Sequence, residues 1–384
     1  MWWRIALLAL GAFAMGTDGF IVAGVLSDIS HQFDIDVAAG GQLVTVFAVV
    51  YALSSPLIAS LCATWPRRRL LLLAMGIFIV ANLFAALADS FTQLLAARVI
   101  AAIASAAYTP CASVCAASMV APHQRGKALS MVMGGITVAT IIGVPLGTWL
   151  GHYGGFRLAF GFVAVLGLVA IMGLALWLPA LRMPSDIDFK ERVQSLLIPG
   201  VPGILAVTAL AMTAGFTVYT YLGPLLASTL HADENTLGMV LMVFGIAGTL
   251  GNMLSGWLVD RWGSRRTVAF SLMGVTLILA VLPALAVTLP GALMGICLWN
   301  AMGWLLLPAQ QHRLISEFPR VGQLLISINA SAMYLGIGMA GAWGGVVLRL
   351  GEAWMLGPAA AGVAFVALAL HGATSGYKRP RLSD

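Results

Sequence analysis

Long apolar runs separated by short polar turns cover almost the whole chain. A helix needs about 20 apolar residues to cross the hydrocarbon core of a membrane. The pattern predicts twelve such spans, which start near residues 5, 40, 69, 91, 126, 156, 198, 235, 267, 290, 322 and 352. Alternating segments of about ten residues, which are typical of membrane β-barrels, do not appear. We therefore predict an all-α polytopic membrane protein with 12 transmembrane helices.

One polar segment is longer than the other connections. "LRMPSDIDFKERVQS" runs from Leu181 to Ser195, is charged and contains proline. It divides the predicted spans into two sets of six. We therefore predict two pseudo-symmetric six-helix bundles, at residues 1–180 and 198–384, joined by a cytoplasmic linker at 181–197.

Composition supports the membrane class. The chain is 60% hydrophobic and 9% charged, whereas soluble domains carry about 25% charged residues. The 43 glycines fit a bundle in which helices pack closely. The four cysteines lie in apolar stretches without the spacing of metal ligands, so we expect no metal site.

Basic residues fall in alternate loops. Those loops hold Arg4, Arg67, Arg68, Arg69, Arg125, Lys127, Arg182, Lys190, Arg192, Arg261, Arg265, Arg266, Arg313, Arg320, Lys378, Arg379 and Arg381. The opposite loops hold acidic residues, with Arg157 and Arg349 as the exceptions. By the positive-inside rule, both termini are predicted to be cytoplasmic. The net charge of +6 then reflects topology and contact with the lipid bilayer, and we expect no nucleic-acid partner.

Two charges, Asp18 and Arg98, are the ones that this scheme places well inside spans. Asp18 lies in "GTDGFIVAGVL" of the first span and Arg98 in "RVIAAIASAA" of the fourth. At 1.5 Å per residue, both come about 10 Å below the outer face of the membrane. We expect the two side chains to face a common cavity and to pair, directly or through water.

An intramembrane carboxylate costs several kcal/mol unless it is paired, protonated or hydrated. A nearby guanidinium stabilises the ionised carboxylate, and moving it away or drying the site favours the protonated form. Conformational change can thus load and unload a proton at Asp18. The alternative is a static ion pair that locks two helices, but buried ion pairs are poor stabilisers compared with apolar packing.

Three motifs resemble the major facilitator superfamily. "GNMLSGWLVDRWGSRRTVAF" matches its loop pattern G-x-L-x-D-R-x-G-x-R-R at Gly256, Leu258, Asp260, Arg261, Gly263, Arg265 and Arg266. "RVIAAIASAA" resembles the motif of the fourth helix, with Ala102 in place of the usual glycine. "GGITVATIIGVPLGTWLG" resembles the exporter motif of the fifth helix, with Gly134, Gly143, Pro145 and Gly147 in place.

Within that superfamily the chain is similar to the twelve-helix drug:proton antiporter family, and it resembles arabinose-efflux-type permeases and chloramphenicol-resistance exporters. Members carry an acidic residue near the position of Asp18. The resemblance implies that Asp260 and the neighbouring arginines close the cytoplasmic side, although a turn that only satisfies helix ends is an alternative. In the first half the equivalent loop has Ala63 and Pro66 at the Asp and Gly positions.

A transporter of this fold binds its substrate near the midplane, between its halves. Polar and aromatic residues of the spans are candidates for that cavity. They are Gln42, Phe47, Tyr51, Asn82, Tyr108, Phe216, Tyr219, Asn300 and Trp304, and secondarily Tyr221, Asn252, Trp299, Gln310 and Asn329. Because no further charge lies at depth, we expect an uncharged, apolar or weakly polar substrate.

The sequence thus predicts a secondary active transporter of the bacterial inner membrane that exports small amphipathic drugs or sugar-like molecules by proton antiport. It needs no cofactor beyond the proton-motive force, and a monomer suffices. Proton-coupled uptake by symport is the alternative. A membrane enzyme or sensor is more remote, because the spans hold no nucleophile with a base and no metal ligand set.

Overall fold

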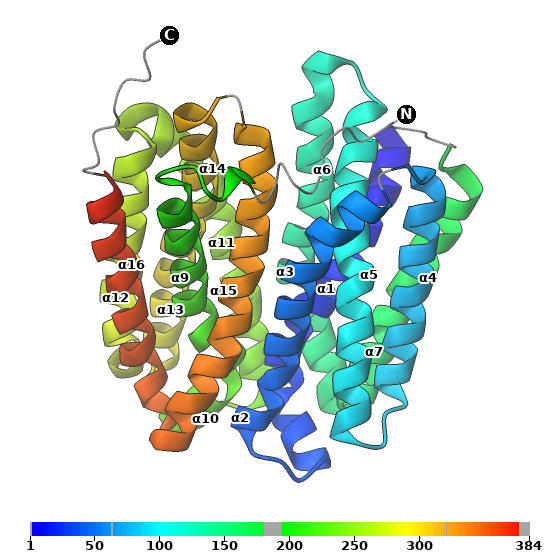
Figure 1. The fold of residues 1–384 in the computed structure, drawn as a ribbon. Coiled ribbons are helices and arrows are strands. Elements are labelled where there is room, and N and C mark those ends of the chain that lie inside the picture. Colours follow the sequence, from blue (N-terminus) through cyan, green and yellow to red (C-terminus); the bar gives the residue numbers. More distant parts are fainter. Residues whose placement is uncertain (1, 63, 180–193, 320, 376–384) are drawn as a thin grey trace.

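The structure is a computed structural model that describes residues 2–62, 64–179, 194–319 and 321–375. Every regular element among these residues is a helix (Figure 1). The first half contains α1 (Trp2–Gln32), α2 (Val37–Gly40), α3 (Gln42–Leu61), α4 (Arg67–Ala86), α5 (Phe91–Ser118), α6 (Arg125–Val138) and α7 (Val144–Trp177). The second half contains α9 (Val201–Thr220), α10 (Leu222–Leu230), α11 (Glu234–Trp262), α12 (Ser264–Leu285), α13 (Leu289–Trp304), α14 (Leu306–Glu317), α15 (Gly322–Leu350) and α16 (Leu356–Ser375). Short helical turns η1 (Pro122–Gln124), η2 (Ala139–Gly143) and η3 (Ala353–Met355) complete the described elements.

The described residues form 11 helical stretches that are long and apolar enough to cross a membrane. One of them, Arg125–Trp177, has 53 residues, or about 80 Å, which is more than twice the hydrocarbon thickness. It bends at Gly154 and Gly155, whose backbone is not helical. The Asp28 carboxylate accepts a hydrogen bond from the Phe156 N–H at 2.5 Å, just after the bend. The stretch therefore supplies two spans, and the predicted twelve spans are confirmed.

Several spans begin at a capping side chain. Ser90 accepts from the Gln93 N–H before α5, and Thr288 accepts from the Gly291 N–H before α13. Asp233 accepts from the Thr236 N–H at 2.9 Å before α11. The hydroxyl and the N–H of Thr236 hold the pKa of this exposed carboxyl below its usual value. These caps satisfy N–H groups that have no partner within the helix.

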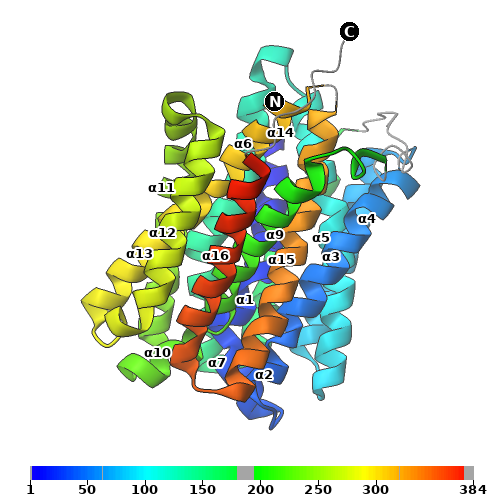
Figure 2. The same cartoon turned by 60° about the vertical axis from the view of Figure 1, so that its left-hand side comes forward.

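The two halves lie side by side along the whole height of the molecule (Figures 1 and 2). α3 packs against α15, and α7 with η2 packs against α11. Small residues permit this approach: a Cβ on Gly245 would lie 2.5 Å from the Thr140 carbonyl oxygen, and one on Gly341 would lie 2.5 Å from the Thr45 hydroxyl. The division into two bundles at residues 1–180 and 198–384 stays a prediction. Most of the predicted linker 181–197 lies outside the described residues, so its boundaries stay a prediction.

The two ends of the molecule differ in charge. α1 begins and α16 ends at the same end (Figure 1), where α4, α6 and α12 also begin with basic residues. We call this the basic end. Asp34, Asp36, Asp89 and Asp233 lie at the opposite, acidic end, in the connections after α1 and α4 and before α11. Which end faces the cytoplasm stays a prediction.

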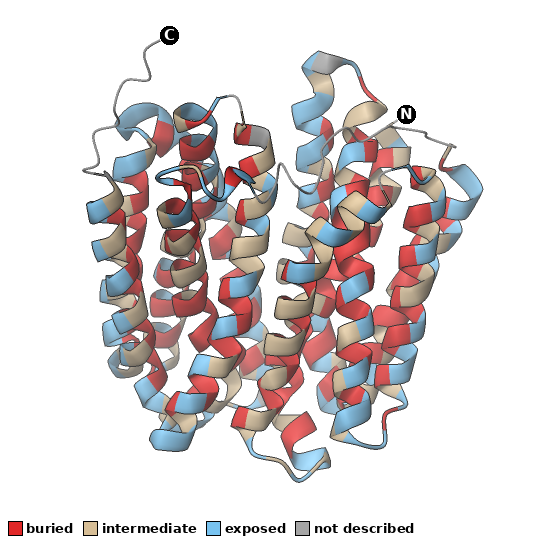
Figure 3. Cartoon of the chain, viewed as in Figure 1, coloured by how far each residue is buried: buried red, intermediate tan, exposed pale blue. Residues whose placement is uncertain are grey.

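Buried positions line the inside of each half, while the outward faces of the helices are exposed (Figure 3). Many exposed side chains are apolar, for example Met172, Leu277 and Phe365. Such a surface is suited to lipid tails, because a bilayer interior offers no water to polar groups.

Candidate functional site

Asp18 and Arg98 form a buried ion pair. Asp18 lies in the middle of α1 and Arg98 in the first half of α5. The Arg98 Nη1 donates to Asp18 Oδ1 at 2.6 Å, and Nη2 donates to the Asp18 backbone carbonyl at 3.2 Å. The side chains are 0% and 1% exposed. The pairing that the sequence left open is therefore direct in this conformation.

The pair is held firmly but is incompletely satisfied. The guanidinium carbon of Arg98 lies 4.2 Å from the centre of the Phe47 ring, a cation–π distance. Asp18 Oδ2 and Arg98 Nε are buried without a hydrogen-bond partner among the described residues. A buried ion pair with donors and acceptors that lack partners contributes little to the stability of the fold. The arrangement suits a group that exchanges a proton.

A pocket between the halves adjoins the ion pair. Residues of α1, α3, α5, α6 and α15 line it, and we call it the central pocket. The aromatic and polar members of its lining are Phe20, Phe47, Tyr51, Ser105, Thr109 and Tyr334. No charged side chain lines it. Phe47 therefore has one contact with the pocket and another with Arg98.

The central pocket bridges both halves. Tyr334 of α15 stacks on Tyr51 of α3, with ring centres 3.7 Å apart. Nearer the acidic end, the Tyr219 hydroxyl donates to the Phe20 carbonyl at 3.1 Å, and Arg349 lies 3.5 Å from Asp36. These contacts join the halves from the acidic end to the pocket.

A second pocket lies within the second half, between α9, α11, α12 and α13, and we call it the inner pocket. Its lining includes Phe216, Phe244, Trp299, Asn300 and Trp304. The inner pocket also lacks charged lining residues.

The structure divides the predicted cavity residues into four groups. Phe47 and Tyr51 line the central pocket, and Phe216, Asn300 and Trp304 line the inner pocket. The Tyr219 ring lies between them, against Phe20, Phe216 and Phe244. The remaining three, Gln42, Asn82 and Tyr108, line neither pocket.

These three side chains are used for local structure. Gln42 donates to the Ala38 carbonyl at 3.5 Å near the acidic end, and Asn82 donates to the Phe78 carbonyl at 3.0 Å inside the first half. The Tyr108 hydroxyl donates to the Leu8 carbonyl at 3.1 Å and ties α5 to α1. Of the secondary candidates, Trp299 joins the inner pocket. The others lie apart: Tyr221, Gln310 and Asn329 are hydrogen-bonded within the second half, and Asn252 is exposed.

Sequence reasoning missed Tyr334, Ser105 and Thr109 of the central pocket. Ser105 and Thr109 follow Arg98 at helical spacing on α5, and that spacing was a usable signal. Tyr334 lies in a long apolar helix whose sequence gives no indication of which face meets the other half.

The predicted gating loop forms a tight turn between α11 and α12. Gly263 has φ +80°, in the region that favours glycine. Arg261 lies over the Trp257 ring at 5.3 Å, and Arg265 reaches Glu317 of α14 at 3.0 Å. Asp260 is exposed and makes no hydrogen bond or ion pair with a described residue. In this conformation the loop's charge contact lies within the second half.

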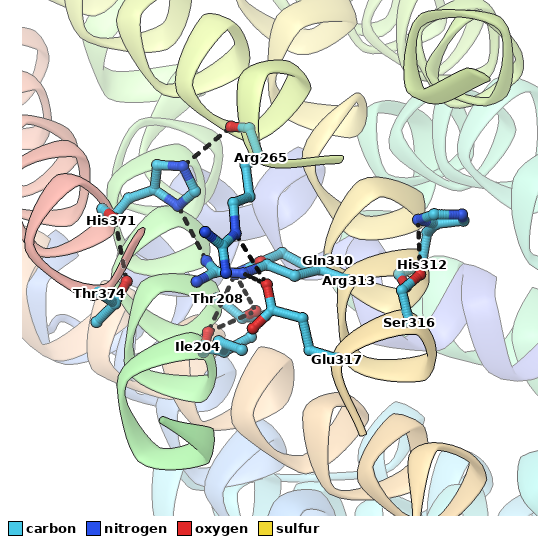
Figure 4. A network of polar contacts seen from close by, with 10 residues as sticks. All are labelled: Ile204, Thr208, Arg265, Gln310, His312, Arg313, Ser316, Glu317, His371 and Thr374. Atoms are coloured by element: carbon cyan, nitrogen blue, oxygen red, sulfur yellow. Dashed lines mark hydrogen bonds and ion pairs between the residues drawn. The ribbon is translucent and has the colours of Figure 1, made fainter. Parts of the chain in front are cut away.

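The structure corrects the placement of Arg313. The sequence scheme put it in a loop, but it lies inside α14 with 1% exposure. Its Nε donates to Glu317 at 2.9 Å, and its Nη1 contacts His371 Nδ1 at 3.2 Å (Figure 4). A guanidinium has only donors, so Nδ1 accepts, and Nε2–H donates to the Arg265 carbonyl at 3.0 Å.

The fifth-span motif packs against α1. A Cβ on Gly143 would lie 2.1 Å from the Thr17 hydroxyl, and one on Gly147 would lie 2.2 Å from Ile21. Gly134, in contrast, has open space around it. The π-helical turn η2 precedes Pro145, which has no N–H to donate to the preceding turn. The motif thus allows a bent helix to pack closely against α1, the helix that carries Asp18.

Comparisons with known proteins agree with this architecture. The model of the Major Facilitator Superfamily matches residues 8–341. The chain is 32% identical to the inner membrane transport protein YdhP of Escherichia coli (strain K12) over 91% of its own length and 90% of that protein. It is 33% identical to a chloramphenicol resistance protein of Streptomyces lividans over 66% of each chain.

Solved structures show the same fold. A bacterial homologue of the human lysosomal transporter Spinster, in an inward-facing and unoccupied conformation, is matched with a TM-score of 0.74 at 19% identity. The match covers 97% of this chain and 96% of the other. The nucleoside transporter NupG is matched with a TM-score of 0.79 at 14% identity, over 97% and 99% of the two chains.

Proposed function

This multi-pass membrane protein belongs to the major facilitator superfamily of transporters, and from that premise we propose that it exports small uncharged amphipathic or sugar-like molecules in exchange for protons. Asp18 carries the proton, and Arg98 competes with the proton for the same carboxylate. The protein acts as a monomer in a bacterial inner membrane, with the basic end toward the cytoplasm. The proton-motive force drives transport, and no cofactor is needed.

The single observation that supports this proposal most strongly is the contact chain from pocket to carboxylate. Phe47 lines the central pocket and lies 4.2 Å from the Arg98 guanidinium, which in turn pairs with Asp18 at 2.6 Å. A ligand that displaces the Phe47 ring changes the position of Arg98. Because Arg98 stabilises the charged carboxylate, its position decides whether Asp18 holds a proton.

The exchange then follows from competition. When Arg98 lies against Asp18, the carboxylate is ionised and its proton has left. When the halves rock and Arg98 withdraws, a carboxylate buried among apolar side chains takes up a proton. Rocking must separate the Tyr51–Tyr334 stack and the contacts at the acidic end, since these join the halves in this conformation. Asp260 and its arginines hold the basic end in the opposite state.

The chemistry of the lining supports the substrate class. Neither pocket has a charged lining residue, and an ion entering such a site would lose its hydration without compensation. The packing of the fifth-span motif against α1 and the relative named for chloramphenicol resistance support export rather than uptake.

The proposal is tested in liposomes that hold a pH-sensitive dye and a potassium ionophore, with no initial pH gradient. Chloramphenicol and a set of small sugars are added outside, one at a time. Under antiport, entering substrate expels protons and the lumen becomes alkaline. Under symport, the lumen becomes acidic, so the sign of the signal separates the two.

Asp18→Asn keeps the shape of the side chain and removes its proton site, so we expect the substrate-dependent pH change to disappear. Asp34→Asn is the matched control, because Asp34 is an exposed carboxylate at the acidic end, and it should behave as wild type. Normal proton movement in Asp18→Asn would rule out Asp18 as the coupling site.

A further inference from the structure

Tyr221 fills a narrow slot between the two halves at the acidic end, where α2 and α10 lie (Figure 1). It is at the junction of α9 and α10 and is fully buried. Its hydroxyl and one edge of its ring face Gly41, the residue before α3, where an added Cβ would overlap the hydroxyl and lie 2.7 Å from Cε1. The other edge faces Gly344 of α15, where an added Cβ would lie 2.6 Å from Cδ2. Each half thus supplies one wall of the slot.

The glycines of this slot are needed for close approach and not for backbone conformation. Gly41 has φ −61° and ψ −18°, values that any residue adopts. Gly344 lies inside α15, where alanine would be the better helix former. A methyl group at either position would nevertheless collide with Tyr221. The two glycines are therefore matched to the ring that lies between them.

The Tyr221 ring is anchored to one half alone. Its hydroxyl donates to the Gly341 carbonyl of α15 at 2.7 Å, within the second half. Among the described residues no hydrogen bond joins the Tyr221 side chain to the first half, so its contact with Gly41 is one of van der Waals packing. Tyr219 differs, because its hydroxyl donates across the interface to the Phe20 carbonyl. Separation of the halves would break the Tyr219 bond but would carry Tyr221 away with α15, its hydrogen bond intact.

We propose that Tyr221 and its slot form a latch, which keeps the acidic end closed and opens without loss of a side-chain hydrogen bond. While α3 and α15 lie together, the ring fills the space between Gly41 and Gly344, and its packing contacts stabilise the closed end. When the halves part, the ring stays on α15 and leaves Gly41. The inference rests on the proposed function only for its premise that the halves rock apart at this end.

An ion pair also joins the halves on the surface at this end. Arg349 of α15 lies 3.5 Å from Asp36, and these side chains are 63% and 57% exposed. Exposed ion pairs contribute little to stability, because water and salt screen their charges. We therefore expect the buried Tyr221 ring, and not this ion pair, to hold the end closed. Asp36→Asn keeps an oxygen that can cap α2 and serves as a control.

Thr45→Cys provides a reporter of opening at the acidic end. The Thr45 hydroxyl is buried without a hydrogen-bond partner and faces α15, where a Cβ on Gly341 would lie 2.5 Å from it. A thiol in its place can react with a water-soluble maleimide only after α3 leaves α15. For this assay the four native cysteines are replaced by serine, in the full-length protein. The rate of labelling is measured in detergent micelles without substrate, so that both ends are open to the reagent.

Gly41→Ala should raise the rate of labelling at position 45 at least tenfold. The added methyl group collides with Tyr221 only in the closed state, and a cost confined to one state shifts the equilibrium toward the other. Gly40→Ala is the matched control, because its added Cβ would meet Leu26 and Ser30 of the same half. Gly40→Ala and Asp36→Asn should each change the rate less than twofold. An unchanged rate in Gly41→Ala, or an equal rise in either control, would overturn the latch.

A double variant tests whether Gly41 acts through Tyr221. Tyr221→Leu removes the hydroxyl, Cζ and Cε1, which are the three atoms nearest to a Cβ at Gly41. It releases the latch, so we expect labelling at position 45 to rise at least tenfold in this variant. Adding Gly41→Ala to Tyr221→Leu should then change the rate less than twofold, because the methyl group no longer meets those atoms. A further tenfold rise would mean that Gly41 acts through another contact and would overturn the latch.

Hydrogen–deuterium exchange on the protein with its native cysteines and Thr45 gives a second measurement. Gly41→Ala should increase deuterium uptake at least twofold in peptides from residues 37–50 and 338–350, and Gly40→Ala should not. Unchanged uptake in Gly41→Ala would also overturn the latch. Neither assay needs a substrate or a pH gradient, so a failed latch would leave the liposome test of proton exchange intact. An observed latch together with normal coupling in Asp18→Asn would instead refute only the proposed proton site.

Discussion

The two halves place their buried charged side chains at different depths along the bundle. The first half holds Asp18 and Arg98 in the middle of its helices, 0% and 1% exposed. The second half has no ion pair at that depth among its described residues. Its buried guanidinium, Arg313, lies near the basic end beside the half-buried Glu317, which also accepts from Arg265. Two bundles of one architecture thus use charge differently.

The difference shows what depth does to a charge. At the basic end several hydrogen-bond partners are close and Arg265 is 47% exposed, so the cluster of Arg313, Glu317, Arg265 and His371 can tie α12, α14 and α16 together (Figure 4). At mid-depth the Asp18–Arg98 contact is buried from solvent, and each buried oxygen that lacks a partner is costly. Under the proposed function, the first half carries the charge that responds to conformational change, while the charges of the second half tie helices together.

The largest expected effect follows from breaking the deep pair on one side. Arg98→Met leaves the Asp18 carboxylate buried alone, and we expect the free energy of unfolding to fall by about 3–5 kcal/mol. Reversible unfolding in mixed detergent micelles measures this loss. The double variant Asp18→Asn/Arg98→Met removes the stranded charge and should lose less than Arg98→Met. Equal losses would mean that the pair contributes packing only.

An intermediate effect is expected at the basic end. Glu317→Gln removes the charge that Arg313 and Arg265 share but keeps an acceptor oxygen. Since Glu317 is 18% exposed and Arg313 retains His371, we expect a loss of about 1.5–3 kcal/mol, the range for hydrogen bonds to charged groups. The same unfolding assay applies. A loss as large as that of Arg98→Met would contradict the contrast between the halves.

The smallest effect is expected at the acidic surface. Asp89 pairs with Arg157 at 3.0 Å, but the side chains are 82% and 41% exposed. Exposed ion pairs contribute about 0–1 kcal/mol, so Asp89→Asn should change the free energy of unfolding by no more than that. Raising the salt concentration should reduce the difference further, because salt screens exposed charges. A larger loss would show that exposure does not rank these three sites.

Some site residues could be predicted because their signal is local. Asp18 and Arg98 stand out by charge alone in apolar runs, and counting residues along each helix placed them at matching depths. Gln42, Asn82 and Tyr108 had an equally local signal, yet their polar groups bond to carbonyls of their own half. Polarity in a span indicates that a partner exists, but it does not say whether that partner is a ligand or the backbone.

By itself the sequence determined the membrane class, the twelve spans, the uneven distribution of charge and the family, since each depends on composition along the chain. The tertiary structure decided the direct contact of Asp18 with Arg98, the burial of Arg313, and the separation of the aromatic candidates into two pockets. These depend on how each helix is rotated about its axis. A helix that is apolar on every side gives no periodic signal for that rotation, so only packing against neighbouring helices fixes it.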